Sequence, residues 1–152
     1  MSWRHFISKL WRRVLSRPDE ACEHSPAHLR RGRVGEDAAR QHLEALGLKY
    51  LTANFRSRRG EIDLVFLEKG CLVFAEVKTR SENSWMRPAE AVNPEKKRRL
   101  SRAALDYLRA IKNPKKPIRF DIVEVLIDDE DQIVEIRHLP NAFSLSRPYR
   151  YG

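Results

Sequence analysis

Four charged residues stand at alternate positions in two neighbouring apolar stretches. Glu61 and Asp63 lie in GEIDLVFLE, and Glu76 and Lys78 lie in CLVFAEVKT. Carboxylates that are brought together in a partly apolar setting repel one another, and Mg²⁺ or Mn²⁺ removes that conflict, since Mg²⁺ is held by one or two carboxylates plus water. A lysine two residues beyond one ligand can stabilise charge that develops on a phosphate. The pattern indicates metal-assisted chemistry on a phosphate ester.

The element that must position these residues is a β-hairpin. Residues 61–68 and 71–79 alternate between apolar and polar and are rich in β-formers, and Lys69-Gly70 between them is typical of a tight turn. A two-residue turn pairs Glu68 with Cys71.

The same register places the charged residues opposite one another. It sets Asp63 against Glu76 and Glu61 against Lys78, with Cβ atoms about 5 Å apart. One face then carries these four residues with Val65, Leu67, Leu72 and Phe74, and the other carries Ile62, Leu64, Phe66, Val73, Ala75 and Val77. Because both faces are mostly apolar, both should be covered, as in a layered α/β domain.

A helix is predicted before the hairpin, from Gly32 to Gly47. Its apolar stripe is Ala39, Leu43 and Leu46, and Gly47 ends it. Glu36 is in line with this stripe near the expected helix start, where the helix dipole favours a negative charge. It is either a third carboxylate at the metal site or a residue paired with a nearby arginine.

A second helix is predicted to begin at Asn93-Pro94, with Asn as N-cap and Pro at the first position. Its stripe is Leu100, Ala103, Ala104, Tyr107, Leu108 and Ile111. Lys96 is four residues before the first of these, so we expect it to face the active centre.

Three further strands complete the expected sheet. Residues 48–58 read as an edge strand, and residues 118–127 and 132–139 as two strands joined by the acidic turn DDED. Basic residues near the edge strand and the second helix are candidates for nucleic-acid binding, or ordinary solvated charges: Arg56, Arg58, Arg59, Lys96 and Lys97.

Composition and charge point to the kind of partner. The chain has 152 residues and a formal net charge of +9, which favours a polyanion: nucleic acid first, DNA rather than RNA, and an anionic membrane surface second. Two cysteines give no disulfide framework and fit a cytoplasmic protein. No apolar run is long enough to span a membrane. The oligomeric state is left open, a dimer included.

The chain divides into three parts. Residues 1–31 form an extension and linker in which residues 1–15 have the pattern of a basic amphipathic helix, which could lie on a membrane, contact nucleic acid or dock on its own domain. Residues 32–139 form the main domain, and residues 140–152 a basic, aromatic tail.

Several motifs occur in order over roughly residues 32–127. They are GRVGEDAARQHLEALG, NFRSRRGEIDLV, LVFAEVKTR, AEAVNPEKKRRLSRAALDYL and IRFDIVEV. Together they resemble the bacterial YraN-type, endonuclease-like family, which is similar to archaeal Holliday-junction resolvases and to nucleases of the PD-(D/E)xK class. Ile62 stands where the name of that class has proline, and residues 1–31 have no counterpart in the family pattern.

The resemblance implies a restriction-endonuclease-like fold, with a central mixed sheet flanked by helices. It implies a Mg²⁺ or Mn²⁺ site at Asp63 and Glu76, with Glu36 as the helix carboxylate of the class. Lys78 completes the catalytic set, and Lys96 matches the basic position of the second helix.

Three functions agree with these features. The first is a metal-dependent endonuclease that acts on DNA, branched or structured rather than sequence-specific. The second is a nucleic-acid-binding protein without catalysis, and the third a peripheral membrane or partner-docking protein that uses residues 1–15. Facing carboxylates favour the first over the second, because a protein that only binds a polyanion gains nothing from them.

Overall fold

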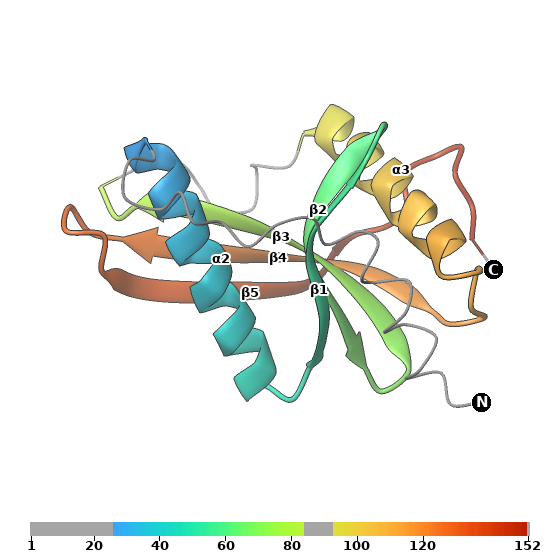
Figure 1. Cartoon of the computed structure of the whole chain (residues 1–152), viewed down its shortest axis with the longest axis horizontal. Helices are drawn as coiled ribbons and strands as arrows, with labels where there is room; N and C mark the ends of the chain where they lie inside the picture. The colour runs from blue at the N-terminus through green and yellow to red at the C-terminus, as the bar shows by residue number, and fades with distance from the viewer. Residues whose placement is uncertain (1–25, 84–92, 152) are drawn as a thin grey trace.

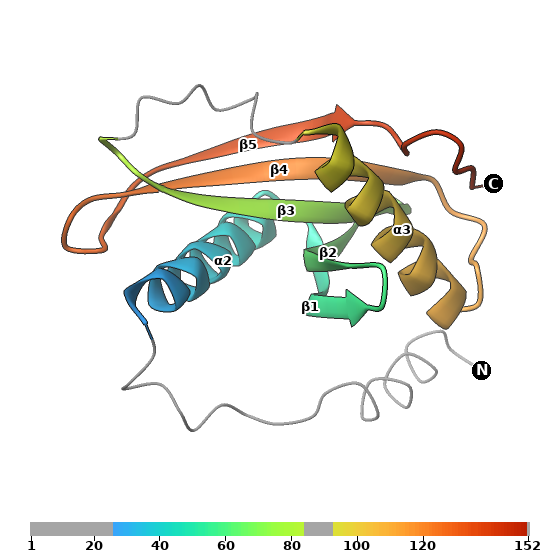
Figure 2. The same cartoon turned by 90° about the horizontal axis from the view of Figure 1, so that it is seen from above.

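The computed structural model describes residues 26–83 and 93–151. They form one sheet with the strand order β1-β2-β3-β4-β5 and two helices (Figure 1 and Figure 2). In chain order the elements are α2 (Ala27–Ala45), β1 (Lys49–Ser57), β2 (Gly60–Glu68), β3 (Cys71–Ser81), α3 (Pro94–Ala110), β4 (Ile118–Ile127) and β5 (Ile133–Phe143). Strands β3 and β4 are parallel and the other neighbours antiparallel, so the predicted mixed α/β sheet is confirmed. The N-terminal helix predicted over residues 1–15 lies outside the described residues.

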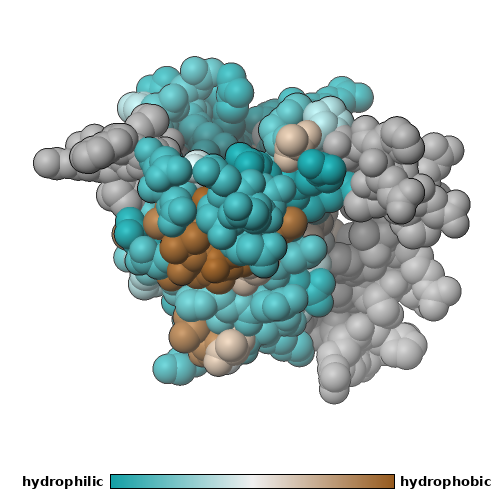
Figure 3. Space-filling view, turned by 90° about the vertical axis from the view of Figure 1, so that its left-hand side faces the viewer, coloured by the Kyte–Doolittle hydropathy of each residue, from teal (hydrophilic) through white to brown (hydrophobic). Residues whose placement is uncertain are grey.

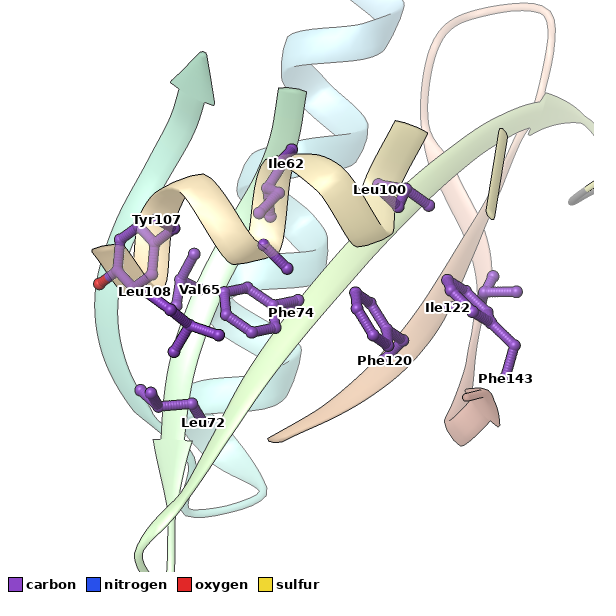
Figure 4. Close-up of a cluster of buried hydrophobic side chains, with 12 residues drawn as sticks. Ile62, Val65, Leu72, Phe74, Leu100, Tyr107, Leu108, Phe120, Ile122 and Phe143 are labelled. Carbon is purple, nitrogen blue, oxygen red and sulfur yellow. The ribbon is translucent and has the colours of Figure 1, made fainter. Parts of the chain in front are cut away.

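The two helices cover opposite faces of the sheet. Helix α3 packs its predicted stripe on Ile62, Val65, Phe74 and Phe120 (Figure 4). Helix α2 packs Ala39 and Leu43 on a second cluster that includes Leu64, Phe66, Val73, Val123 and Val125. In both views the β1–β2 hairpin lies between the two helices. The point where the hairpin meets β3 is therefore within reach of both.

The predicted tight turn is confirmed. Lys69 and Gly70 have φ angles of 46° and 86°, as a two-residue type I′ turn requires at both central positions. The predicted register holds from Glu68–Cys71 to Leu64–Ala75.

The predicted pairing of Asp63 with Glu76, and of Glu61 with Lys78, is wrong, because the ladder between β2 and β3 ends at Leu64–Ala75. Beyond that point β3 keeps pairing with β4 as far as Ser81–Ile127, whereas β2 follows β1. A strand cannot follow two diverging neighbours, so the edge of β3 from Glu76 onward is released from β2. This gap contains the candidate site.

The hairpin also changes face where it leaves β3. Ala53 and its partner Leu64 belong with the α2-side cluster, but Phe55 and its partner Ile62 belong with the α3-side cluster. Asn54, between the two pairs, has φ of 53°, a conformation that kinks and twists a strand. The prediction that Ile62 shares a face with Leu64 is therefore wrong.

Helix α2 begins earlier than predicted, at Ala27, and Gly47 follows its end with φ of 91°. Glu36 therefore lies in the middle of the helix, and the predicted stabilisation by the dipole at the N-terminus does not apply. Leu46 is 54% exposed and does not belong to the buried stripe, which is Gly35, Ala39 and Leu43.

Gly35 is the position where α2 lies closest to β3. A Cβ there would lie 1.8 Å from Thr79 Oγ1 and 3.0 Å from Thr79 Cβ, so rotation of the threonine would not make room for it. We expect Gly35→Ala to lower the free energy of unfolding by about 1–3 kcal/mol through overpacking, measured by urea unfolding.

Gly32, one turn earlier, is the matched control. A Cβ there would meet nothing within 4 Å, so Gly32→Ala should raise stability by up to about 1 kcal/mol through helix propensity. Equal effects at the two glycines would contradict the close contact with Thr79, and Thr79→Ala should recover part of the loss in Gly35→Ala.

Helix α3 starts as predicted. The side chain of Asn93 accepts a hydrogen bond of 2.8 Å from the backbone N–H of Lys96, and Pro94 occupies the first turn. Structured residues also extend past the predicted boundary at residue 139: β5 ends at Phe143, and Ser146 N donates to Ser101 Oγ on α3 at 2.9 Å.

The described surface is mainly polar on the side shown in Figure 3, with hydrophobic residues gathered in a smaller area. The large hydrophobic side chains that stay exposed in the described residues are Leu29, Val34, Leu46, Ile133 and Val134. Neither described helix combines the length and the apolar character that crossing a membrane requires.

Candidate active site

A cavity of about 400 Å³ lies at the released edge of β3. We call it the acidic cavity. It is lined by part of α2 with Glu36, by Asp63 of β2, by residues 76–81 of β3, and by Lys96 of α3. The structure thus brings together the four residues predicted as catalytic, with Lys96, from four separate elements.

Asp63 is held at the edge of β3 by a backbone contact. Its Oδ2 accepts a hydrogen bond of 2.7 Å from the N–H of Val77, a donor that β2 no longer satisfies after the strands separate. Burial, and then the negative charge of Glu76, raise the pKa of Asp63 to about 7. The carboxylates of Asp63 and Glu76 repel each other when both are ionised, so the second of them loses its proton at a higher pH.

Glu76 is buried and contacts two lysines. Lys78 Nζ lies 3.1 Å from Glu76 Oε1, and Lys96 Nζ forms an ion pair with the same oxygen. Burial lowers the pKa of Lys78. Burial also tends to lower the pKa of Lys96, but the contact with Glu76 has the larger effect and the pKa of this lysine is raised. The predicted inward orientation of Lys96 is confirmed, whereas Lys78 contacts Glu76 and not Glu61.

Glu36 approaches from the helix side of the acidic cavity. Its carboxylate is hydrogen-bonded to the side chain of Asn54, at the kink of β1. Burial raises the pKa of Glu36, and the charges of Glu61 and Glu76 add to this effect. The kink therefore also provides the contact that holds this helix carboxylate.

The acids of the cavity are close enough to influence one another's charge, but they do not form a complete metal cage. Within residues 26–83 and 93–151, no group of three His, Cys, Asp or Glu side chains is gathered closely enough to hold a metal. A hard cation bound at Asp63 and Glu76 would take its other ligands from water or from substrate oxygens.

A second cavity, of about 460 Å³, adjoins the acidic one and shares Lys96 with it. We call it the basic cavity. The end of β1 supplies Arg56 to its wall, the turn between β1 and β2 supplies Arg58 and Arg59, and α3 supplies Arg99. Four of the five predicted nucleic-acid-binding residues thus line the basic cavity, with Lys96 shared between the two cavities.

Several charges near the basic cavity already have partners. Arg59 is paired with Asp106, and Arg56 lies 3.6 Å from Glu61. Lys97 lines neither cavity and lies over the Phe143 ring, with Nζ 5.7 Å from its centroid. The side chain of Glu61 is 66% exposed, and Glu61 does not line the acidic cavity.

Sequence reasoning missed three residues around the site. Asn54 supports Glu36, Arg80 lines the acidic cavity, and Glu124 is fully buried on β4. The signals were weak: a lone Asn in an edge strand, an arginine two residues after Lys78, and a charge inside the apolar run IRFDIVEV.

A five-stranded mixed sheet with a helix on each face, and a carboxylate site where two strands separate, define an α/β protein consistent with the restriction-endonuclease-like fold. The chain belongs to the family described as "Uncharacterised protein family UPF0102", the YraN family, which matches residues 35–125. The resemblance of the sequence motifs is confirmed.

Relatives extend over most of the chain. A UPF0102 protein of Chlorobium phaeobacteroides is 42% identical over 116 residues, which is 74% of this chain and 92% of the relative. A UPF0102 protein of Symbiobacterium thermophilum is 43% identical over 112 residues, 74% of this chain and 94% of the relative. One from Chlorobaculum parvum is 42% identical over 124 residues, 79% and 95% of the two chains.

Proposed function

We propose that the protein is a metal-dependent endonuclease that hydrolyses phosphodiester bonds in DNA, branched or structured DNA above all. The observation that carries the proposal is the acidic cavity, in which Asp63 and Glu76 share a released strand edge with Lys78 and Lys96. Glu36 adds a third carboxylate from α2.

The donors of the acidic cavity fit Mg²⁺ or Mn²⁺. Asp63 and Glu76 would hold the ion, and Glu36 would face it directly or through water. Burial and then the charge of Glu76 raise the pKa of Asp63, and this supports the assignment because a nearby divalent cation favours the ionised carboxylate and offsets both effects. When bound, such an ion polarises a phosphate and lowers the pKa of a bound water.

The lysines supply the rest of the chemistry from this chain. Lys78 is next to the carboxylates and can orient a water molecule or offset negative charge on a phosphate. Lys96 lies between the acidic and basic cavities, so a phosphate that enters can replace Glu76 as its partner. Arg58 can then contact the nucleic-acid backbone beside the reacting phosphate, as can Arg56 and Arg59 if they exchange Glu61 and Asp106 for phosphates.

A second candidate is a nucleic-acid-binding protein without catalysis. It is favoured by the two lysines on Glu76, which already balance that charge, and by the lack of a three-ligand cluster in the described residues. Both candidates use the basic cavity, and they differ only in turnover. Docking on a membrane or a partner through residues 1–15 remains a third hypothesis.

The deciding experiment is a cleavage assay on four-way junctions, flaps, linear duplexes and single strands, with RNA counterparts of each. We expect products only with Mg²⁺ or Mn²⁺, with faster cleavage of the branched DNA, and none in EDTA. Salt-dependent binding without product on every substrate would instead establish the second candidate.

A further inference from the structure

Two buried polar groups stand unpaired beside the acidic cavity. Glu124 of β4 is fully buried, and neither of its carboxylate oxygens has a hydrogen-bond partner in the described part of the chain. The Nε of Arg80 on β3 is also buried without a partner there. Buried polar atoms are normally paired, because an unmet donor or acceptor destabilises the fold. Packing alone does not account for this pair.

Glu124 and Arg80 lie near each other on the adjacent strands β4 and β3. Glu124 is the register partner of Lys78, and Arg80 follows two residues later on the same strand, where side chains return to the same face. Burial raises the pKa of Glu124, and the positive charges of Arg80 and Arg137 act in the opposite direction.

The other cations near Glu124 are committed elsewhere. Arg137 donates to both oxygens of Glu135 at 2.7 and 2.8 Å, and Lys78 is paired with Glu76. Among residues 26–83 and 93–151, Arg80 is therefore the nearby cation without another carboxylate partner that can balance Glu124.

Arg80 also lines the acidic cavity, beside Glu76 and Lys78. A guanidinium presents its N–H donors as a rigid fork that fits two oxygens of a phosphate. Because the Nε is buried, the terminal amino groups of the guanidinium are the donors that a phosphate in the cavity would meet. The charge of Glu124 acts on Arg80 from the neighbouring strand.

We infer that Arg80 binds the phosphate of a nucleic acid in the acidic cavity, and that Glu124 is a positioning residue whose buried negative charge orients the Arg80 guanidinium without a direct hydrogen bond to it. The inference rests on the proposed function for the nature of the ligand. The proposed contact lies on β3 in the acidic cavity. The arginines of the basic cavity would bind other phosphates, and Lys96 lines both cavities.

The first test measures binding of a fluorescein-labelled DNA four-way junction to the full chain, by anisotropy in Ca²⁺. We expect Arg80→Ala to weaken binding about tenfold and to reduce the salt slope by about one. Arg80→Lys keeps the charge without the fork and should fall in between. Arg98→Ala removes an exposed arginine that lines neither cavity, and it should bind nearly as the unchanged protein does.

The second test separates positioning from structural support. Glu124→Gln should weaken junction binding about threefold while its melting temperature stays the same or rises, since the substitution removes an unpaired buried charge. Glu130→Gln, in an exposed turn, should change neither value. A lower melting temperature of Glu124→Gln, or unchanged binding, would remove the positioning role.

The two proposals can fail separately. Unchanged binding by Arg80→Ala overturns the phosphate contact, whatever the cleavage assay shows. Weaker binding by that variant, with no cleavage of any substrate by the unchanged protein, leaves the contact standing and removes the nuclease activity.

Discussion

Asp63→Asn is expected to reduce metal-dependent DNA cleavage by at least about 100-fold without loss of the fold. The change removes the charge that would hold the cation, but an amide oxygen can still accept the hydrogen bond that Val77 N–H donates to Oδ2. The measurement is the single-turnover rate on the best DNA substrate in Mn²⁺, together with the circular dichroism spectrum of the variant.

The choice of asparagine matters because Asp63 does two things. Asp63→Ala would also leave the Val77 N–H without its acceptor, so a loss of stability there would not report on the metal site. Asp129→Asn makes the same chemical change in the exposed β4–β5 turn and should cleave at the normal rate. Full activity in Asp63→Asn would refute the assignment of this residue.

The unfolding free energy of the metal-free protein is expected to fall as pH rises from about 4 to about 7. The pKa of Asp63 is raised from 3.8 to about 7 in the folded chain, so over this range the folded state holds a proton that the unfolded state has released. Stability then decreases with pH and levels off above the folded pKa. The loss is at most about 4 kcal/mol, and less where Glu76 shares the proton.

Urea unfolding of the unchanged protein and of Asp63→Asn in EDTA, between pH 5 and 8.5, measures this effect. The variant lacks the titrating group, so its stability relative to the unchanged protein should increase from pH 5 to about pH 7 and stay constant above that. Added Mn²⁺ should stabilise the unchanged protein more at pH 8 than at pH 6, because the metal binds the ionised carboxylate. Parallel curves in EDTA would show that Asp63 does not titrate in this range.

Much of the fold could be predicted because the signals are local. The Lys69-Gly70 turn, the Asn93-Pro94 helix start and Gly47 after α2 each depend on backbone preferences of one or two residues. Apolar periodicity similarly identified the stripe of α3 and the strands that form the core. The start of α2 was misplaced because the stretch before Gly32 is polar and carries no apolar stripe.

The residues of the site could be predicted from the sequence, but the way in which the strands bring them together could not. A two-residue turn fixes the register of a hairpin only while its strands stay paired, and here pairing ends at Leu64–Ala75. Neither the parallel pairing that draws β3 toward β4 nor the kink at Asn54 leaves a periodic signal in the sequence. The facing pair of acids was therefore expected inside the ladder, whereas the structure places it where the ladder opens.

The sequence by itself determined the hairpin, the two described helices and the charged residues that line the acidic cavity. These follow from turn chemistry, capping and periodicity over a few neighbouring positions. Only the tertiary structure decided that Lys96 contacts Glu76, that Asn54 supports Glu36, and that Arg80 and Glu124 lie together unpaired. Such contacts join residues from separate elements, and their distances are set by how strands and helices pack, which no short stretch of sequence encodes.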